Sequence, residues 1–115
     1  MRKKIKDAWI AALRSRKYKQ AQGALRTEDG RRHCCLGVLT DLYVRATGDD
    51  DIWDAGDNLT LPDGVSAWAG IHGDDVRVAE RPSRRGGDSP CKYLSDLNDG
   101  GYGFRAIATI IENEA

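Results

Sequence analysis

The 115-residue sequence lacks the features of membrane-bound and exported proteins. It has no run approaching the roughly 20 apolar residues of a membrane-spanning helix, and no apolar segment follows its basic start at residues 1–4. Only three cysteines are present, an odd number in which Cys34 and Cys35 are adjacent, so we expect reduced thiols rather than a disulfide framework. These absences predict a cytoplasmic protein.

Motifs for cofactors, metals and nucleic acids are also missing. There is no glycine-rich spacing of the P-loop or dinucleotide kind, and the cysteines and histidines show no CxxC or HxxxH spacing, so we expect neither cofactor nor metal. The acidic run 49–57 lacks the spaced carboxylates of a calcium loop. Without zinc-finger spacing or a basic-plus-aromatic stacking motif, nucleic acid is not an expected partner.

What is present fits one small domain spanning residues 1–115. At 40% hydrophobic residues, a chain of this length can build one modest core and bury about two-thirds of its unfolded surface. No internal repeat divides it. A second domain would not fit.

The charge is distributed unevenly although the net charge is zero. Residues 1–32 carry 11 lysines and arginines against 3 acidic residues, and the remainder carries 7 against 15. The two halves can neutralise each other within the fold or across a subunit interface, and we expect the chain to form a homo-oligomer. Alternatively, the basic half holds an anion site.

The segment 17–43 combines a polar cluster, a hairpin signal and the start of a helix. Residues 23–27 and 31–35 flank Glu28-Asp29-Gly30, and Asp-Gly between two extended runs predicts an antiparallel hairpin. From Leu36 the apolar spacing changes to that of a helix, with Gly48 as its stop. The adjacent cysteines therefore lie where a strand passes into a helix N-terminus.

The fold class predicted is α+β, a small antiparallel sheet built on this hairpin and packed with about four helices. Trp9 is expected in the core, and Trp53 is expected either to pack on the core or to be available to bind a ligand. The other elements expected are a helix at 3–16, an exposed mobile segment at 49–57, a helix at 63–69, a strand at 74–80, a loop at 81–90 and helices at 91–97 and 104–112.

Cys34 and Cys35 admit two interpretations. A helix N-terminus lowers a thiol pKa and His33 is close in sequence, so a nucleophilic thiol is conceivable. However, the apolar Cys-Cys-Leu-Gly-Val-Leu context favours buried packing residues. We therefore predict no catalytic residue, and we expect Gly37 to permit close packing against the hairpin.

Motifs along nearly the whole chain resemble a family of small phage-encoded proteins. They are the run Trp9, Ala12-Leu13-Arg14-Ser15, Tyr18-Lys19-Gln20, Gly23-Ala24-Leu25-Arg26 and Cys34-Cys35-Leu36-Gly37-Val38-Leu39, then Leu61-Pro62, Trp68-Ala69-Gly70, Leu97-Asn98-Asp99, Phe104, Ile107-Ala108 and Ile111-Glu112. Arg16 and the shortened, glycine-rich region 98–103 depart from the pattern. Small phage proteins of this class include counter-defence "sponges" that bind cyclic ADP-ribose-like signals or cyclic dinucleotides without cleaving them.

The resemblance and the residues together suggest a phage-type anti-defence protein that sequesters a small nucleotide immune signal in the infected bacterial cell. Arg26 and Arg32 would contact phosphate, Tyr18 and Trp53 would stack on the base, and Gln20, Asn98 and Asp99 would bind ribose or base edges. Two alternatives stay open. One is an enzyme that degrades the signal through His33 or Cys34, assisted by Asp99. The other is a protein-binding inhibitor of a host factor that uses the acidic segment 49–57.

Overall fold

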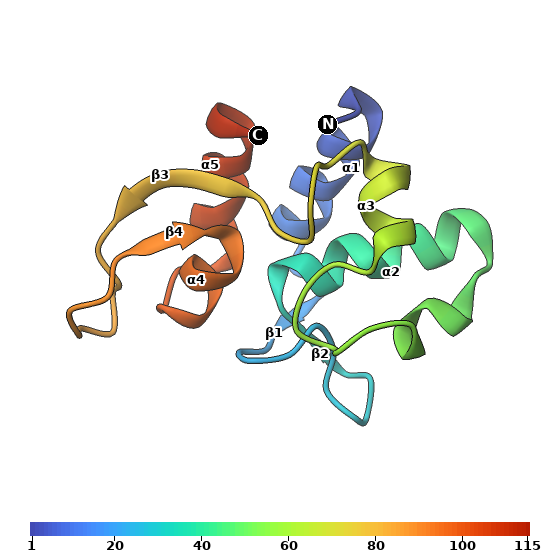
Figure 1. The fold of residues 1–115 in the computed structure, drawn as a ribbon, viewed down its shortest axis with the longest axis horizontal. Coiled ribbons are helices and arrows are strands. Elements are labelled where there is room, and N and C mark those ends of the chain that lie inside the picture. Colours follow the sequence, from blue (N-terminus) through green and yellow to red (C-terminus); the bar gives the residue numbers. More distant parts are fainter.

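Helices account for most of the regular structure. The computed structural model describes residues 1–115. It contains five α-helices, one 3-10 helix and two separate two-stranded sheets (Figure 1). The elements are α1 (Lys3–Arg14), β1 (Lys19–Gln20), β2 (Arg32–His33), α2 (Cys35–Thr47), η1 (Asp50–Asp54), α3 (Asp63–Ala69), β3 (Arg77–Arg81), β4 (Cys91–Tyr93), α4 (Leu94–Asp99) and α5 (Phe104–Glu114). The α+β class is confirmed. None of the helices has both the length and the apolar character needed to cross a membrane.

The core lies where α1, α2, α4 and α5 meet. On α1, the apolar spacing of Trp9, Ile10 and Leu13 gives one buried face, and the expected core position of Trp9 is confirmed. Opposite it lies α5, which runs alongside α1 and buries Ile107 and Ile111 (Figure 1). Burying each such aliphatic side chain stabilises the fold by about 1.5–3 kcal/mol, so this pairing is one of the main sources of stability.

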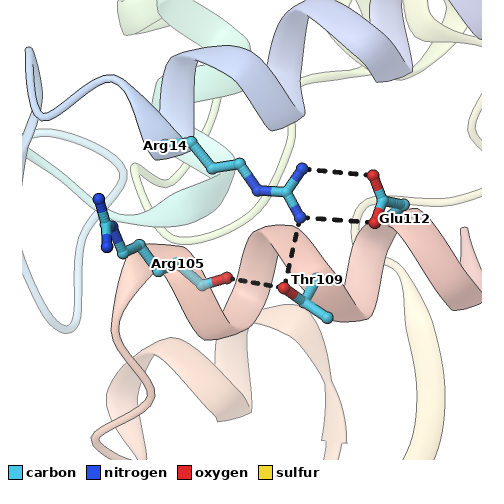
Figure 2. A network of polar contacts seen from close by, with 4 residues as sticks. All are labelled: Arg14, Arg105, Thr109 and Glu112. Carbon is cyan, nitrogen blue, oxygen red and sulfur yellow. Dashed lines mark hydrogen bonds and ion pairs between the residues drawn. The ribbon is translucent and has the colours of Figure 1, made fainter.

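A polar contact closes the solvent side of the α1–α5 pair. The guanidinium of Arg14 reaches both carboxylate oxygens of Glu112, at 3.2 and 3.5 Å, and donates to the Thr109 hydroxyl at 3.3 Å (Figure 2). Thr109 in turn donates to the Arg105 carbonyl. Because the ion pair is about half exposed, we expect it to add only about 0–1 kcal/mol.

The first half of α2 is buried. Residues 35–40 are covered on every side, with Leu36, Val38 and Leu39 fully inaccessible. Cys34 is its N-cap, so the cysteine pair does lie at the passage from β2 into the helix. The helix ends as predicted at Gly48, whose φ of 77° is the left-handed conformation that glycine adopts without strain.

The predicted hairpin is reduced to one antiparallel bridge, between Arg26 and His33. Gly30 does form the expected turn, with φ 72° and its N–H donating to the Thr27 carbonyl. The first strand fails to form because Leu25 N–H donates instead to the carbonyl of Asn58, 2.7 Å away. β2 pairs with β1, in parallel, and the predicted single antiparallel sheet becomes two small sheets.

The second sheet shifts two predicted elements. β3 begins at Arg77 rather than at residue 74, and it pairs with β4 in an antiparallel ribbon. The helix predicted at 91–97 is wrong over its first three residues, which form β4. The carboxylate of Asp96 accepts the N–H groups of Lys92 and Tyr93 and so starts α4 only at Leu94.

The free edge of β3 is covered by the last helix. Glu114 accepts the N–H of Ala79 at 2.6 Å and pairs with the Arg81 guanidinium, also at 2.6 Å. These bonds hold the carboxylate in its ionised form and lower the pKa of Glu114, with the Arg81 contact as the larger cause. The ribbon is therefore fastened to α5 by a side chain.

The segment 49–57, predicted to be exposed and mobile, contains the 3-10 helix η1. Its carboxylates at positions 50, 51 and 54 are exposed, whereas Ile52 and Trp53 are buried. Trp53 is 9% exposed and thus packs on the core, one of the two roles considered for it. After this segment, α3 has the predicted bounds of residues 63–69.

Gly37 is required for the close approach of the 23–26 segment to α2. A Cβ atom at this position would lie 1.7 Å from the carbonyl oxygen of Leu25. Alanine in a helix is favoured over glycine by about 1 kcal/mol, but overpacking costs about 1–3 kcal/mol or more, so the clash dominates. The expected role of Gly37 in close packing is confirmed.

We expect Gly37→Ala to lower the free energy of unfolding by about 2 kcal/mol or more in urea denaturation, because the clash outweighs the gain in helix propensity. Gly56→Ala is the matched control, since its Cβ would meet no atom within 4 Å and its stability should change by no more than about 0.5 kcal/mol. Equal stability of the two variants would contradict the packing role.

Candidate functional site

The structure distributes the seven predicted ligand residues over three places. One group forms a polar network around the buried Asn98 at the end of α4, another stacks around His33, and one residue stands alone on the surface. The network contains Gln20, Asn98 and Asp99, the stack contains Tyr18, Arg26 and Trp53, and the exposed residue is Arg32.

Asn98 is fully buried, and its amide makes hydrogen bonds to two other segments of the chain, residues 20–21 and the start of α2. Its Oδ1 accepts the backbone N–H of Cys35 at 3.1 Å and the side-chain amide of Gln20 at 2.9 Å, and its Nδ2 donates to the Ala21 carbonyl at 2.7 Å. Gln20 also donates to the carbonyl of Tyr102. Both amides thus serve the scaffold, and Asn98 is out of reach of any ligand.

Asp99 belongs to the same network although its side chain is exposed. Its Oδ1 accepts the N–H of Gly23 at 2.9 Å. Gly23 has φ 77°, a conformation suited to glycine, and the bond fastens the start of the 23–26 segment. No hydrogen bond links Asp99 to Cys34 or His33, so the catalytic grouping considered as an alternative is not assembled.

The second group is a stack of side chains centred on His33. The ring of Tyr18 meets His33 edge-on at 5.4 Å between centroids, and His33 lies 5.8 Å from Trp53. The Arg26 guanidinium covers the ring of Trp53 at 4.1 Å, within the distance of a cation–π contact. Trp53 and Arg26 therefore bind each other rather than offering open surfaces for a base and a phosphate.

His33 is 7% exposed, and neither ring nitrogen has a hydrogen-bond partner; Nδ1 is itself buried. Burial lowers its pKa, the nearby Asp41 partly opposes the shift, and Arg26 and Arg45 add to it. The imidazole is consequently neutral near pH 7. It acts as an aromatic packing group between Tyr18 and Trp53.

Tyr18 is held by a bond to α2. Its hydroxyl donates to Oδ2 of Asp41 at 2.5 Å, and the same oxygen accepts Nε of Arg45 at 2.8 Å. Burial and the bond to Asp41 raise the pKa of Tyr18 to about 12. Burial alone would raise the pKa of Asp41, but the bonds from Tyr18 and Arg45 lower it. The pair thus consists of a neutral phenol and a carboxylate.

Beside this pair lies a cavity between α1 and α2, which we call the Tyr18 pocket. Its volume is about 350 Å³, and its lining consists of Ala11, Ala12, Ser15, Lys17, Tyr18, Leu42 and Arg45. Arg16 directly precedes the lining residues Lys17 and Tyr18. Its left-handed φ of 65° turns the backbone sharply after α1. Small and apolar residues form part of the wall, and two cations, Lys17 and Arg45, line it together with the tyrosine.

Of the seven predicted residues, only Tyr18 lines this pocket. Lys17 is its neighbour in the polar segment 15–22 and could have been included from that pattern. Arg45 could not, because nothing in the helical sequence of α2 indicates that its side chain lies beside a tyrosine 27 positions earlier.

The cysteines occupy packing positions. All three are free and buried, and Cys34 accepts the N–H of Gly37 as the N-cap of α2. Burial raises the pKa of Cys34 to about 11 and that of Cys35 well above its usual value. Such thiols are protonated at neutral pH and poor nucleophiles. No cluster of three or more histidine, cysteine or acidic side chains is arranged to hold a metal ion.

The chain belongs to the family described as "Domain of unknown function (DUF8296)", whose model matches residues 1–115. No curated protein and no solved structure matches it. The family description carries no activity, so a function has to be inferred from the residues of the site.

We expect Asn98→Ala to lower the free energy of unfolding by about 3 kcal/mol or more, because it leaves the N–H of Cys35 and the carbonyl of Ala21 buried without partners at about 1–3 kcal/mol each. Chemical denaturation measures the loss. Asn113→Ala, at an exposed position of α5, is the control. An unchanged free energy of unfolding would contradict the structural role of Asn98 and make it a candidate ligand residue again.

Stability should also decrease as the pH falls below the unfolded histidine pKa of about 6.5, because the unfolded chain takes up a proton that buried His33 resists. Urea unfolding between about pH 7.5 and about pH 5 should show this slope, while the loss due to Asp41 begins at lower pH. His33→Gln should flatten the slope, and His72→Gln, at an exposed position, should not. A slope that persists in His33→Gln would assign it to other groups.

Proposed function

We propose that the protein binds a small anionic ligand of the nucleotide type in the Tyr18 pocket and holds it without chemical change. The observation that carries the proposal is that one aromatic ring and two cations line the same cavity of about 350 Å³. That volume falls in the range of about 300–1,000 Å³ typical of small-molecule sites.

The two cations have donors available for an anion. Lys17 is exposed and forms no ion pair. Arg45 uses Nε for Asp41, so its terminal nitrogens can donate to phosphate oxygens in the paired geometry that guanidinium favours. The bond that Arg45 donates to Asp41 also restricts the Arg45 side chain before a ligand arrives, which reduces the entropy lost on binding.

Tyr18 supplies the neutral part of the recognition. Its ring is about half buried and its hydroxyl is committed to Asp41, so its orientation is determined by the protein. A base can stack on the part that faces the cavity. With Ala11, Ala12 and Leu42 beside it, the ring provides an apolar surface next to the charged groups.

Retention without cleavage is favoured because the pocket contains no reactive pair. Cys34 is not among its lining residues, and burial keeps the thiol protonated. His33 contacts Tyr18 from inside the core and forms no hydrogen bond to a nucleophile. An enzyme that degrades the ligand is therefore the weaker candidate.

The likeness to small phage-encoded proteins suggests a biological role for such a binder. By sequestering a cyclic ADP-ribose-like signal or a cyclic dinucleotide, it would lower the free concentration that a bacterial defence system detects. Inhibition of a host protein through segment 49–57 is less well supported, because the large apolar side chains of this segment, Ile52 and Trp53, are buried in the fold.

A thermal-shift screen of nucleotide signals followed by calorimetric titration tests the site. We expect Lys17→Ala to weaken binding of the best ligand roughly tenfold to hundredfold, since a charge-assisted contact is worth about 1.5–3 kcal/mol. Arg32→Ala is the matched control, because it removes one exposed cation that does not line the pocket. Equal loss in both variants would indicate general charge attraction instead of this site.

Mass spectrometry of the ligand after incubation and denaturation separates retention from catalysis. Intact ligand supports sequestration. An altered mass that depends on the folded protein would contradict it and favour the enzyme.

A further inference from the structure

A second recessed surface runs along α3 and the segment that follows it. It consists of three adjoining hollows of about 460, 600 and 170 Å³. The first and second share Asp63 and Asp74, and the second and third share Ile71 and His72. The hollows therefore form one continuous surface depression, which we call the α3 groove. It has no lining residue in common with the Tyr18 pocket.

The first two hollows of the groove are acidic. Their lining includes Asp57, Asp63 and Asp74 and contains no lysine or arginine. Neither Asp63 nor Asp74 is in an ion pair. Because like charges that share a surface without counter-charges destabilise the fold, this end of the groove is suited to a cationic partner.

An unpartnered polar group lies in the same place. Ser66 lines the middle hollow, is 6% exposed, and its buried hydroxyl has no hydrogen-bond partner. Buried polar groups in folded proteins are nearly always bonded, so the unpartnered hydroxyl at the wall of the groove marks a position that the isolated subunit leaves incomplete.

Basic side chains adjoin the opposite end of the groove. The third hollow itself has groups of both signs, with Met1 and Arg77 beside Asp75, and the chain continues from Met1 into Arg2, Lys3 and Lys4. All three of these cations are exposed, and only Lys3 has an acidic partner, Asp7 in the next turn. One subunit thus carries both members of a complementary pair of surfaces, side by side along one groove.

We infer that the α3 groove is the interface of a two-fold symmetric dimer, in which the basic first turn of each subunit lies over the acidic end of its partner's groove. A two-fold axis pairs two grooves in opposite directions, so each basic end meets an acidic end and both contacts form at once. A chain with no net charge has no overall repulsion to oppose this association. The inference goes beyond the proposed ligand function and does not depend on it.

Sedimentation velocity of the intact chain tests the dimer. At low ionic strength we expect twice the 12.7 kDa mass of one chain, and at about 1 M salt at least tenfold weaker association, because salt screens the charge pairs. A 12.7 kDa species at every salt and protein concentration would overturn the inference. Binding of an arginine-rich peptide to the groove of such a monomer would assign the groove to a different partner and would also overturn it.

Charge exchange identifies the surfaces. The acid variant is Asp63→Lys with Asp74→Lys, and the base variant is Arg2→Glu with Lys4→Glu. Each alone should be monomeric, whereas an equimolar mixture should form a heterodimer, because every groove then again meets a turn of opposite charge.

If a reversal variant does not fold, Asp63→Asn with Asp74→Asn replaces it and should weaken the dimer at least tenfold. Reversal variants that remain dimeric would overturn the assignment. Ligand titration of the monomeric variants should be unchanged, which separates this inference from the Tyr18 pocket.

Discussion

The amide of Asn98 is the constraint on which the arrangement of the chain depends. One side chain on α4 bonds to the first residue of α2, to the side chain of Gln20 on β1 and to the carbonyl of Ala21. Three partner groups and both ends of the Asn98 amide are thus satisfied together. A shorter or charged side chain could not make the same bonds, so segments far apart in sequence are held in one register.

The position of the Tyr18 pocket follows from that register. With Gln20 fixed on Asn98, the residues just before it must return over α2, and the left-handed turn at Arg16 makes this possible. Tyr18 then meets Asp41 on one side and the ring of His33 on the other. The pocket is therefore built on the core packing of the protein, and its tyrosine has little freedom to move.

Periodicity predicted most of the helices and did not predict how the strands pair. The helix ending at Gly48 and the helix at 63–69 could be placed because apolar spacing and turn residues act locally. The hairpin could not be, because the partner of Leu25 is Asn58, 33 positions away, and no local pattern encodes that bond. The grouping of the predicted site residues could not be read from the sequence for the same reason. Gln20 and Asn98 look like ligand residues in a sequence, and only their mutual contact shows that they serve the scaffold.

The contact of Glu114 with β3 has a consequence for solubility. A two-stranded ribbon exposes unpaired backbone groups along its edges, and such edges can recruit strands of other molecules into aggregates. Here the carboxylate occupies the N–H of Ala79, and its ion pair with Arg81 places charge along the same edge. An approaching strand would have to displace the Glu114 carboxylate from the N–H of Ala79 and separate it from the Arg81 guanidinium. The free energy lost with this partly buried ion pair is not offset by one new backbone hydrogen bond. The ribbon can thus remain small and open without becoming a template for β-aggregation.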